Sequence, residues 1–175
     1  MSMDEVSETL KAQIASLFRV ISAANCYKQD NVPCEIEKGL FLGSVGAAAN
    51  KDALKNLGVT HVLTVANTLI PAHPNDFVYK TLNVVDRQDV DIKQYFNECF
   101  DFIDESKSLG GGTLVHCFAG KSRSVTIVVA YLMKTRRMSL SQALEHVKSR
   151  RPVASPNSGF IRQLEDFEKS LQVAD

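Results

Sequence analysis

The sequence predicts an α/β fold: a central, mostly parallel sheet flanked by helices, with one extra helix at the N-terminus. From Gly39 onward, short runs of Thr, Val, Leu and Ile alternate with longer segments of helical periodicity, an order typical of parallel sheets. The chain of 175 residues is long enough for one well-cored domain and too short for two ordinary ones. We therefore expect one main domain at residues 32–172, preceded by a helix and linker at 1–31 and followed by a tail at 173–175.

The first thirty residues carry an apolar stripe. Its members recur at spacings of three and four: Val6, Leu10, Ile14, Leu17 and Ile21. This spacing predicts an amphipathic helix that ends before Pro33, with residues 28–31 as a polar linker. A stripe of a couple of heptads leaves three roles open, namely docking on the main domain, self-association and binding of a partner.

The remaining elements follow in chain order. Strands rich in β-branched and apolar residues are predicted at 40–42, 59–66, 78–85 and 113–115. Helices are predicted at 52–57, 92–108, 123–137, 139–150 and 158–171. Gly58 and the glycines at 110–112 end the first two helices, Ser139 caps the fourth, and Pro152 stops it.

The most informative segment is HCFAGKSRS, residues 116–124, which lies between a predicted strand and a predicted helix. Its small residues let the backbone curl until successive N–H groups point at one spot. The helix that follows adds free N–H groups and the positive end of its dipole. We therefore expect a phosphate-binding loop. Its residues are Phe118, Ala119, Gly120, Lys121, Ser122 and Arg123.

The same field favours a thiolate, so Cys117 is a plausible nucleophile toward a bound phosphoryl group. Arg123 can hold two phosphate oxygens with its planar guanidinium. The AGKS stretch shares residues with a nucleotide-binding P-loop, but that motif needs glycine at the position of Val115. The pattern thus favours phosphoryl transfer to Cys117 over nucleotide binding.

HCFAGKSRS resembles the Cys-x5-Arg-Ser/Thr signature of the cysteine-dependent protein tyrosine phosphatases, and most of all the dual-specificity branch. The resemblance covers roughly residues 32–172 and includes the segments GLFLGS, THVLTVA, YFNECFDFID and RPVASPNSGFIRQL. It implies a small, atypical dual-specificity phosphatase. Such an enzyme hydrolyses phosphotyrosine and phosphoserine or phosphothreonine through a phosphocysteine intermediate, without a cofactor or metal, and MAP kinases are family-typical substrates.

Phosphoryl transfer also needs a proton for the leaving oxygen, and the candidate acids are Asp86, Asp89 and Asp91. Asp86 is favoured because it directly follows the predicted strand, whose end could lie beside the loop. The resemblance agrees, since VVD at 84–86 stands where the family places its acid. We expect Asp86 to act as general acid and then as general base.

Four further residues have supporting roles in this prediction. His116 is expected to orient the cysteine and the loop rather than to act as a base. Ser124, by resemblance, eases departure of the thiolate in the second step. Asn157 resembles a family residue that braces the loop, although SPN is also an ordinary helix-capping sequence. Lys121 is expected to face solvent or to contact an acidic substrate.

Composition limits the possible partners. Lys plus Arg number 20, as do Asp plus Glu, so there is no global attraction to nucleic acid or membrane. The 4 cysteines form no CxxC pair, which argues against disulfides or a zinc site and suggests a reducing, cytosolic or nuclear location. One basic set, either a solvated face or a surface for an acidic, calmodulin-like partner, comprises Lys134, Arg136, Arg137, Lys148, Arg150 and Arg151.

Two other functions remain open from sequence. A phosphoinositide phosphatase would share the same loop, although Lys121 is the only lysine in it, which weakly favours protein substrates. A phosphoprotein-binding module that has lost catalysis would also keep the loop. Intact Cys117, Arg123 and Ser124 argue against the second alternative.

Overall fold

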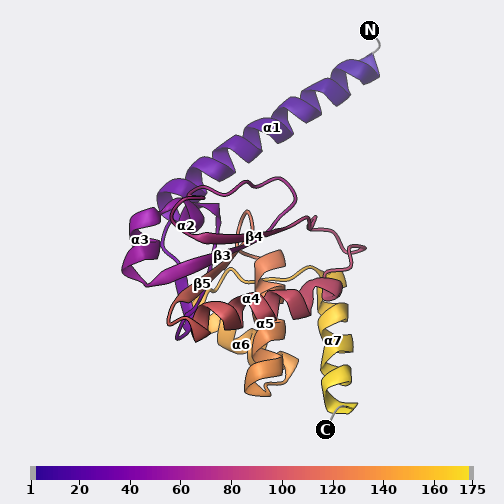
Figure 1. The fold of residues 1–175 in the computed structure, drawn as a ribbon. Helices are drawn as coiled ribbons and strands as arrows, with labels where there is room; N and C mark the ends of the chain where they lie inside the picture. The colour runs from indigo at the N-terminus through magenta and orange to yellow at the C-terminus, as the bar shows by residue number, and fades with distance from the viewer. Residues whose placement is uncertain (1–2, 174–175) are drawn as a thin grey trace.

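The computed structural model describes residues 3–173, and a five-stranded sheet forms its centre (Figure 1). The strand order is β1-β2-β5-β3-β4, with β1 at Cys34–Glu37, β2 at Leu40–Gly43, β5 at Gly112–His116, β3 at Val59–Val65 and β4 at Val78–Leu82. The pairs β2–β5, β5–β3 and β3–β4 are parallel, and β1 pairs antiparallel with β2. The predicted mostly parallel sheet is confirmed.

Helices cover both faces of this sheet. One face carries α2 (Val45–Ala49) and α3 (Lys51–Asn56), and the other carries α4 (Phe96–Ser108), α5 (Arg123–Arg136), α6 (Leu140–Arg150) and α7 (Ser158–Val173). Figure 1 shows α4 to α7 gathered on one side of the strands. A short 3-10 turn, η1 at Lys93–Tyr95, leads into α4.

Each face of the sheet carries its own hydrophobic cluster, and the pleating of the strands explains which residues join which cluster. Leu40 and Leu42 of β2 belong to the cluster that α4 to α7 form, whereas Phe41 between them packs with α2 and α3. On β5, Val115 belongs to the cluster with α4 to α7, and Leu114 belongs to the cluster with α2 and α3. Because both faces are covered, the central strands read as continuous apolar runs. The first ten residues after Arg123 on α5 are all buried, which fixes the start of this helix under the sheet.

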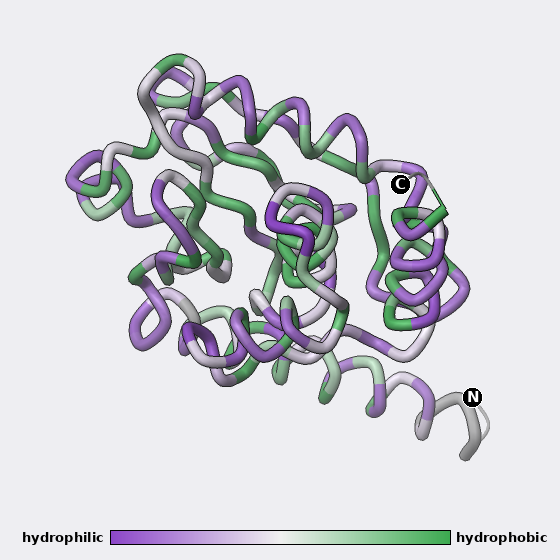
Figure 2. The backbone as a smooth tube through the Cα atoms, turned by 90° about the horizontal axis from the view of Figure 1, so that it is seen from below, coloured by the Kyte–Doolittle hydropathy of each residue, from purple (hydrophilic) through white to green (hydrophobic). Residues whose placement is uncertain are grey.

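The C-terminal end of the N-terminal helix α1 (Met3–Gln29) contacts α2, whereas its N-terminal part extends away from the body of the molecule (Figures 1 and 2). It continues two residues into the segment expected to be a linker. Its apolar stripe stays exposed from Leu10 to Ile21, with Leu17 at 59% and the neighbouring Phe18 at 67%. The side chain of Val6 lies outside the described residues.

Several predicted boundaries are wrong by a few residues. The strand predicted at 78–85 ends at Leu82, because the Val84 N–H bonds the Leu82 carbonyl and turns the chain out of the sheet. The helix predicted from residue 92 starts at Phe96, because the Gln163 side chain binds the N–H groups of residues 92 and 93 in the preceding turn. Helix α7 extends to Val173, one residue into the expected tail. The predicted cap at Ser139 is present, and it forms a capping box with Gln142.

Candidate active site

The predicted phosphate loop leaves the sheet at its centre. Cys117 directly follows β5, which lies between β2 and β3, and all three strands end at this edge. The Val45 N–H bonds the Phe118 carbonyl at 3.0 Å and so ties the loop to the start of α2. The carboxyl edge of a parallel sheet is the usual ligand-binding edge of α/β folds.

Cys117 and Ser124 face each other across the loop. The sulfur of Cys117 lies 3.2 Å from the Ser124 hydroxyl, and both residues are buried. Ser124 belongs to the first turn of α5, so its hydroxyl is held by the helix. A hydroxyl at this distance can donate a hydrogen bond to a thiolate.

The loop keeps its backbone donors free. Within residues 3–173, no protein acceptor bonds the backbone N–H groups of residues 118–122. Gly120 adopts φ +64°, and a Cβ there would lie 2.5 Å from the Gly43 carbonyl oxygen and 2.6 Å from an Arg151 nitrogen. Glycine is therefore required for this curvature. Free N–H groups beside the N-terminus of α5 suit an anion.

Within the described residues, the guanidinium of Arg123 is hydrogen-bonded through one nitrogen, Nη1. Its Nη1 donates to the Val84 carbonyl at 3.1 Å and to Asn67 Oδ1 at 3.4 Å. Its Nε is buried and has no hydrogen-bond partner among the described residues. Since an unpaired buried donor is costly, this nitrogen is suited to an anionic ligand.

Asp86 is attached to the loop by two neighbours. Its Oδ1 accepts hydrogen bonds from the Ser122 hydroxyl and from Asn157 Nδ2, both at 2.8 Å. The other candidate acids make no hydrogen bond to the loop among the described residues: Asp89 pairs with Arg87, and Asp91 accepts a hydrogen bond from the Gln94 N–H. Asp86 is exposed, so it can meet an incoming substrate.

Asn157 both caps a helix and makes hydrogen bonds to Ser122 and Asp86. Its Oδ1 accepts a hydrogen bond from the Phe160 N–H at the start of α7, as a helix cap does. Its own backbone N–H bonds the Ser122 hydroxyl at 2.9 Å, and Nδ2 reaches Asp86. The SPN turn therefore braces the loop while it starts the helix.

His116 is buried behind the nucleophile. Its Nδ1 lies 3.1 Å from the Cys117 carbonyl, so this nitrogen is the donor, and Nε2 then accepts from the Thr64 hydroxyl at 2.8 Å. Burial is the main reason why the pKa of His116 falls to about 4; the hydrogen bond to the Cys117 carbonyl opposes this shift, and the charge of Arg123 contributes to it. The imidazole is therefore neutral near pH 7, and its two hydrogen bonds link the start of the loop to Thr64 of β3.

The prediction that Arg151 lies on the basic surface is wrong. This residue is 4% exposed, and its guanidinium donates to the Gly120 carbonyl at 2.7 Å and the Ala119 carbonyl at 3.0 Å. It also pairs with Asp30 at 2.7 Å. The sequence carries no local signal for this pair, since the two residues lie 121 positions apart. The other members of the basic set are exposed.

Comparison with known proteins places this geometry in a family. Residues 40–170 match the model of the dual specificity phosphatase catalytic domain. The chain belongs to the dual specificity phosphatase family. It is 64% identical over 173 residues to dual specificity protein phosphatase 1 of Arabidopsis thaliana, covering 99% of this chain and 87% of that protein.

Solved structures agree with this assignment. Human DUSP28 superposes with a TM-score of 0.77 at 34% identity, covering 80% of this chain and 95% of the other. The human tyrosine phosphatase-like serine/threonine/tyrosine-interacting protein superposes with a TM-score of 0.77 at 35% identity, covering 81% of this chain and 99% of the other. The α/β fold is thus that of a dual specificity protein phosphatase.

A cavity of about 620 Å³ adjoins the loop of this phosphatase. Phe118, Arg123 and Asp86 line it on the side of the catalytic loop, and Arg19 and Val20 of α1 line it on another side. Lys121 is exposed and does not line this cavity. Among residues 3–173, no group of three His, Cys, Asp or Glu side chains is arranged to hold a metal ion.

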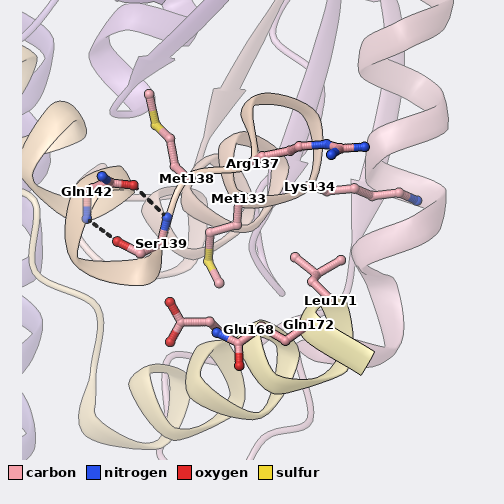
Figure 3. A pocket seen from close by; sticks show the side chains of 9 residues that line it. All are labelled: Met133, Lys134, Arg137, Met138, Ser139, Gln142, Glu168, Leu171 and Gln172. Carbon is pink, nitrogen blue, oxygen red and sulfur yellow. Dashed lines mark hydrogen bonds between the residues drawn. The ribbon is translucent and has the colours of Figure 1, made fainter. Parts of the chain in front are cut away.

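A second cavity, of about 410 Å³, lies between the ends of α5, α6 and α7 (Figure 3). Met133, Lys134 and Arg137 line it from the C-terminal end of α5 and the residue beyond, and Glu168 from α7. The catalytic loop precedes the other end of α5, roughly 20 Å away at 1.5 Å per helical residue. This cavity is therefore separate from the phosphatase site.

Proposed function

We propose that the protein hydrolyses phosphotyrosine and phosphoserine or phosphothreonine in proteins through a phosphocysteine on Cys117. One observation carries the proposal: the Cys117 sulfur faces the Ser124 hydroxyl at 3.2 Å in a loop with free N–H groups. Arg123, with its unpaired Nε, stands at the end of the same loop. These groups supply a nucleophile and the donors for a phosphoryl dianion.

The reaction has two balanced steps. In the first, the Cys117 thiolate attacks phosphorus, the bond to the substrate oxygen breaks, and Asp86 gives its proton to that oxygen. In the second, Asp86 takes a proton from water, the water oxygen attacks phosphorus, and the S–P bond breaks. The Ser124 hydroxyl then donates a hydrogen bond to the leaving thiolate. Arg123 and the loop N–H groups hold the phosphoryl oxygens throughout.

Signalling kinases such as MAP kinases are the substrates that we propose for this site. The support is membership of the family and the open cavity beside the loop, which suits a flexible phosphorylated segment. Self-association through the exposed stripe of α1 is a further proposal, supported by the exposure of Leu17 and Phe18. Binding of an acidic, calmodulin-like partner is also still a prediction, and its basic surface now excludes Arg151.

Location in the cytosol or nucleus stays a prediction. Within the part of the chain that the structure describes, no helix combines the length and the apolar character needed to cross a bilayer.

A second candidate function is phosphoprotein recognition without turnover. It is favoured by the likeness to a protein whose name describes it as phosphatase-like and interacting. The two functions differ in one measurable respect, because a binding module retains phosphopeptides but releases no phosphate.

The deciding experiment measures phosphate release from doubly phosphorylated threonine–tyrosine peptides and from a panel of phosphoinositides, with chelator present. The wild type, Cys117→Ser and Asp86→Ala are compared. We expect the wild type to dephosphorylate both peptide residues, Cys117→Ser to be inactive and Asp86→Ala to be slow. Turnover of lipids alone would change the substrate class, and tight peptide binding without turnover would support the binding module.

A further inference from the structure

The cavity beside the catalytic loop is bounded by two parts of the chain that lie far apart in the sequence. One wall is formed by Phe118 and Arg123 of the catalytic loop and by Asp86, which accepts a hydrogen bond from Ser122 of the same loop. The N-terminal helix supplies another wall through Arg19, Val20 and Ala23. Because the catalytic loop forms one wall, we expect a peptide whose phosphate enters the loop to place its neighbouring residues in or across this cavity.

Most of the lining is apolar, and it comes from four segments of the chain. The apolar residues are Val20, Ala23, Ala66, Leu69, Val85 and Phe118. A volume of about 620 Å³ is within the usual range for ligand pockets and exceeds what one phosphoryl group requires. The space therefore suits side chains that flank the phosphorylated residue.

Arg19 introduces positive charge on the α1 wall. It is exposed, and within the described residues it has no ion-pair partner. Of the other charged groups that line the cavity, Arg123 serves the phosphate site and Asp86 is bonded by Ser122 and Asn157. Arg19 is thus the guanidinium in this cavity that is free to bind an additional anion.

The position of this wall is fixed at its C-terminal end. Directly after α1, Asp30 pairs with buried Arg151 and its carbonyl accepts a hydrogen bond from Ser44 at 2.8 Å. Asn50 Nδ2 bonds the next carbonyl, that of Asn31, also at 2.8 Å. Arg19 stands eleven residues before Asp30, roughly 16 Å along the helix. A continuous helix anchored in this way can hold Arg19 at a constant place relative to the loop.

From this arrangement we infer that α1 forms part of the substrate site, and that Arg19 binds a second negative group on the peptide, close in sequence to the phosphorylated residue. The inference rests on the proposed phosphatase function. The second group is a phosphate or a carboxylate, since a guanidinium binds both. The enzyme would therefore prefer phosphopeptides with an acidic or phosphorylated neighbour and an apolar flanking residue.

The test uses one phosphotyrosine peptide in three forms, with a neutral residue, a glutamate or a phosphothreonine two positions before the phosphotyrosine. The full chain is used, and kcat/KM for phosphotyrosine is measured for each peptide. The quantity compared is the ratio of kcat/KM for each charged peptide to that for the neutral one. We expect ratios of roughly 3 to 5 in the wild type, the size of an exposed charge pair. Arg19→Ala should bring them close to 1, and Arg19→Glu below 1.

Lys28→Ala is the matched control, because Lys28 is an exposed cation on the same helix that does not line the cavity. It should keep the wild-type ratios. Equal ratios in the wild type and Arg19→Ala would overturn the inference, as would an equal loss on all three peptides. Failure of the wild type to hydrolyse even the neutral peptide would instead contradict the proposed function. A response to phosphothreonine but not glutamate, or the reverse, identifies which anion Arg19 binds.

Discussion

Asp30 and Arg151 form an ion pair at 2.7 Å that joins the segment after α1 to the catalytic loop. Arg151 is the central residue, because it also donates to the carbonyls of Gly120 and Ala119. Burial of Asp30 opposes its ionisation, but the hydrogen bonds and charge of Arg151 outweigh this effect and lower the pKa of Asp30. The loop is therefore held in place by a buried charged residue that binds its carbonyl groups.

Replacing Arg151 should destabilise the protein and disorder its loop. Arg151→Met leaves Asp30 and two loop carbonyls unpaired, and we expect a loss of about 2 to 3 kcal/mol in the free energy of unfolding. This is less than the full cost of breaking a buried pair, because Asp30 is 34% exposed. Urea unfolding of Arg151→Met and of the adjacent, exposed Arg150→Met gives the comparison. Equal stability of the two variants would contradict the role of Arg151.

His116 should make the protein less stable in mild acid. The folded-state pKa is about 4, against 6.5 for an ordinary histidine, so below pH 6.5 the unfolded chain binds a proton that the folded chain does not. Stability should therefore fall by up to about 1.4 kcal/mol per pH unit between these two values. Unfolding measured from pH 7 to pH 4 should show a steeper decline in the wild type than in His116→Gln. Parallel curves would show that His116 does not titrate in this way.

Asp86 should matter more as the leaving group becomes more basic. A p-nitrophenolate departs without much help, whereas the alkoxide of serine or threonine needs a proton. Asp86→Asn should lower kcat on phosphothreonine peptides by about 100-fold or more, and by much less on p-nitrophenyl phosphate. Asp89→Asn is the matched control, because Asp89 is an exposed carboxylate that pairs with Arg87 instead of bonding Ser122 and Asn157. An equal effect of Asp86→Asn on both substrates would argue against proton donation by Asp86.

The thiols should differ sharply in reactivity. Burial raises the pKa of Cys99 to about 12, so this thiol should resist alkylation and oxidation in the folded protein. Cys117 faces the loop and should be oxidised by mild peroxide, with loss of activity that a thiol reductant reverses. Mass spectrometry of alkylated peptides locates the modification. Oxidation at Cys99 before Cys117 would contradict this assignment. Cys34 is half-buried beside Arg151, and the side chain of Cys26 lies outside the described residues.

Much of the active loop could be predicted because its chemistry is local. Strand, cysteine, small residues and helix follow one another within HCFAGKSRS, and the structure folds them in that order. Asp86 could also be proposed from the sequence, because it closely follows β4, a strand that is parallel to β3. By contrast, the link from Asp30 to Arg151 depends on two residues far apart in the chain and outside any periodic pattern.

Two elements escaped prediction because each carries a weak signal. Strand β1 has the sequence CEIE and buries only Ile36 among its four residues, as short edge strands often do. Helix α2 consists of five residues, too few to show a period, and its start is marked only by Ser44, whose hydroxyl accepts from the Gly46 N–H. Both elements lie outside HCFAGKSRS, so the local pattern of the loop carries no signal for them.

The most direct test of the mechanism is to trap the phosphocysteine. Ser124→Ala removes the hydroxyl that faces the Cys117 sulfur at 3.2 Å, so release of the thiolate should become slow. The variant is mixed with a phosphotyrosine peptide, denatured within one turnover at neutral pH, digested and analysed by mass spectrometry. The account predicts one phosphoryl group on the peptide that contains Cys117, and none when Cys117→Ser is added. Full turnover in the Cys117→Ser enzyme, or phosphate attached to another residue, would contradict it.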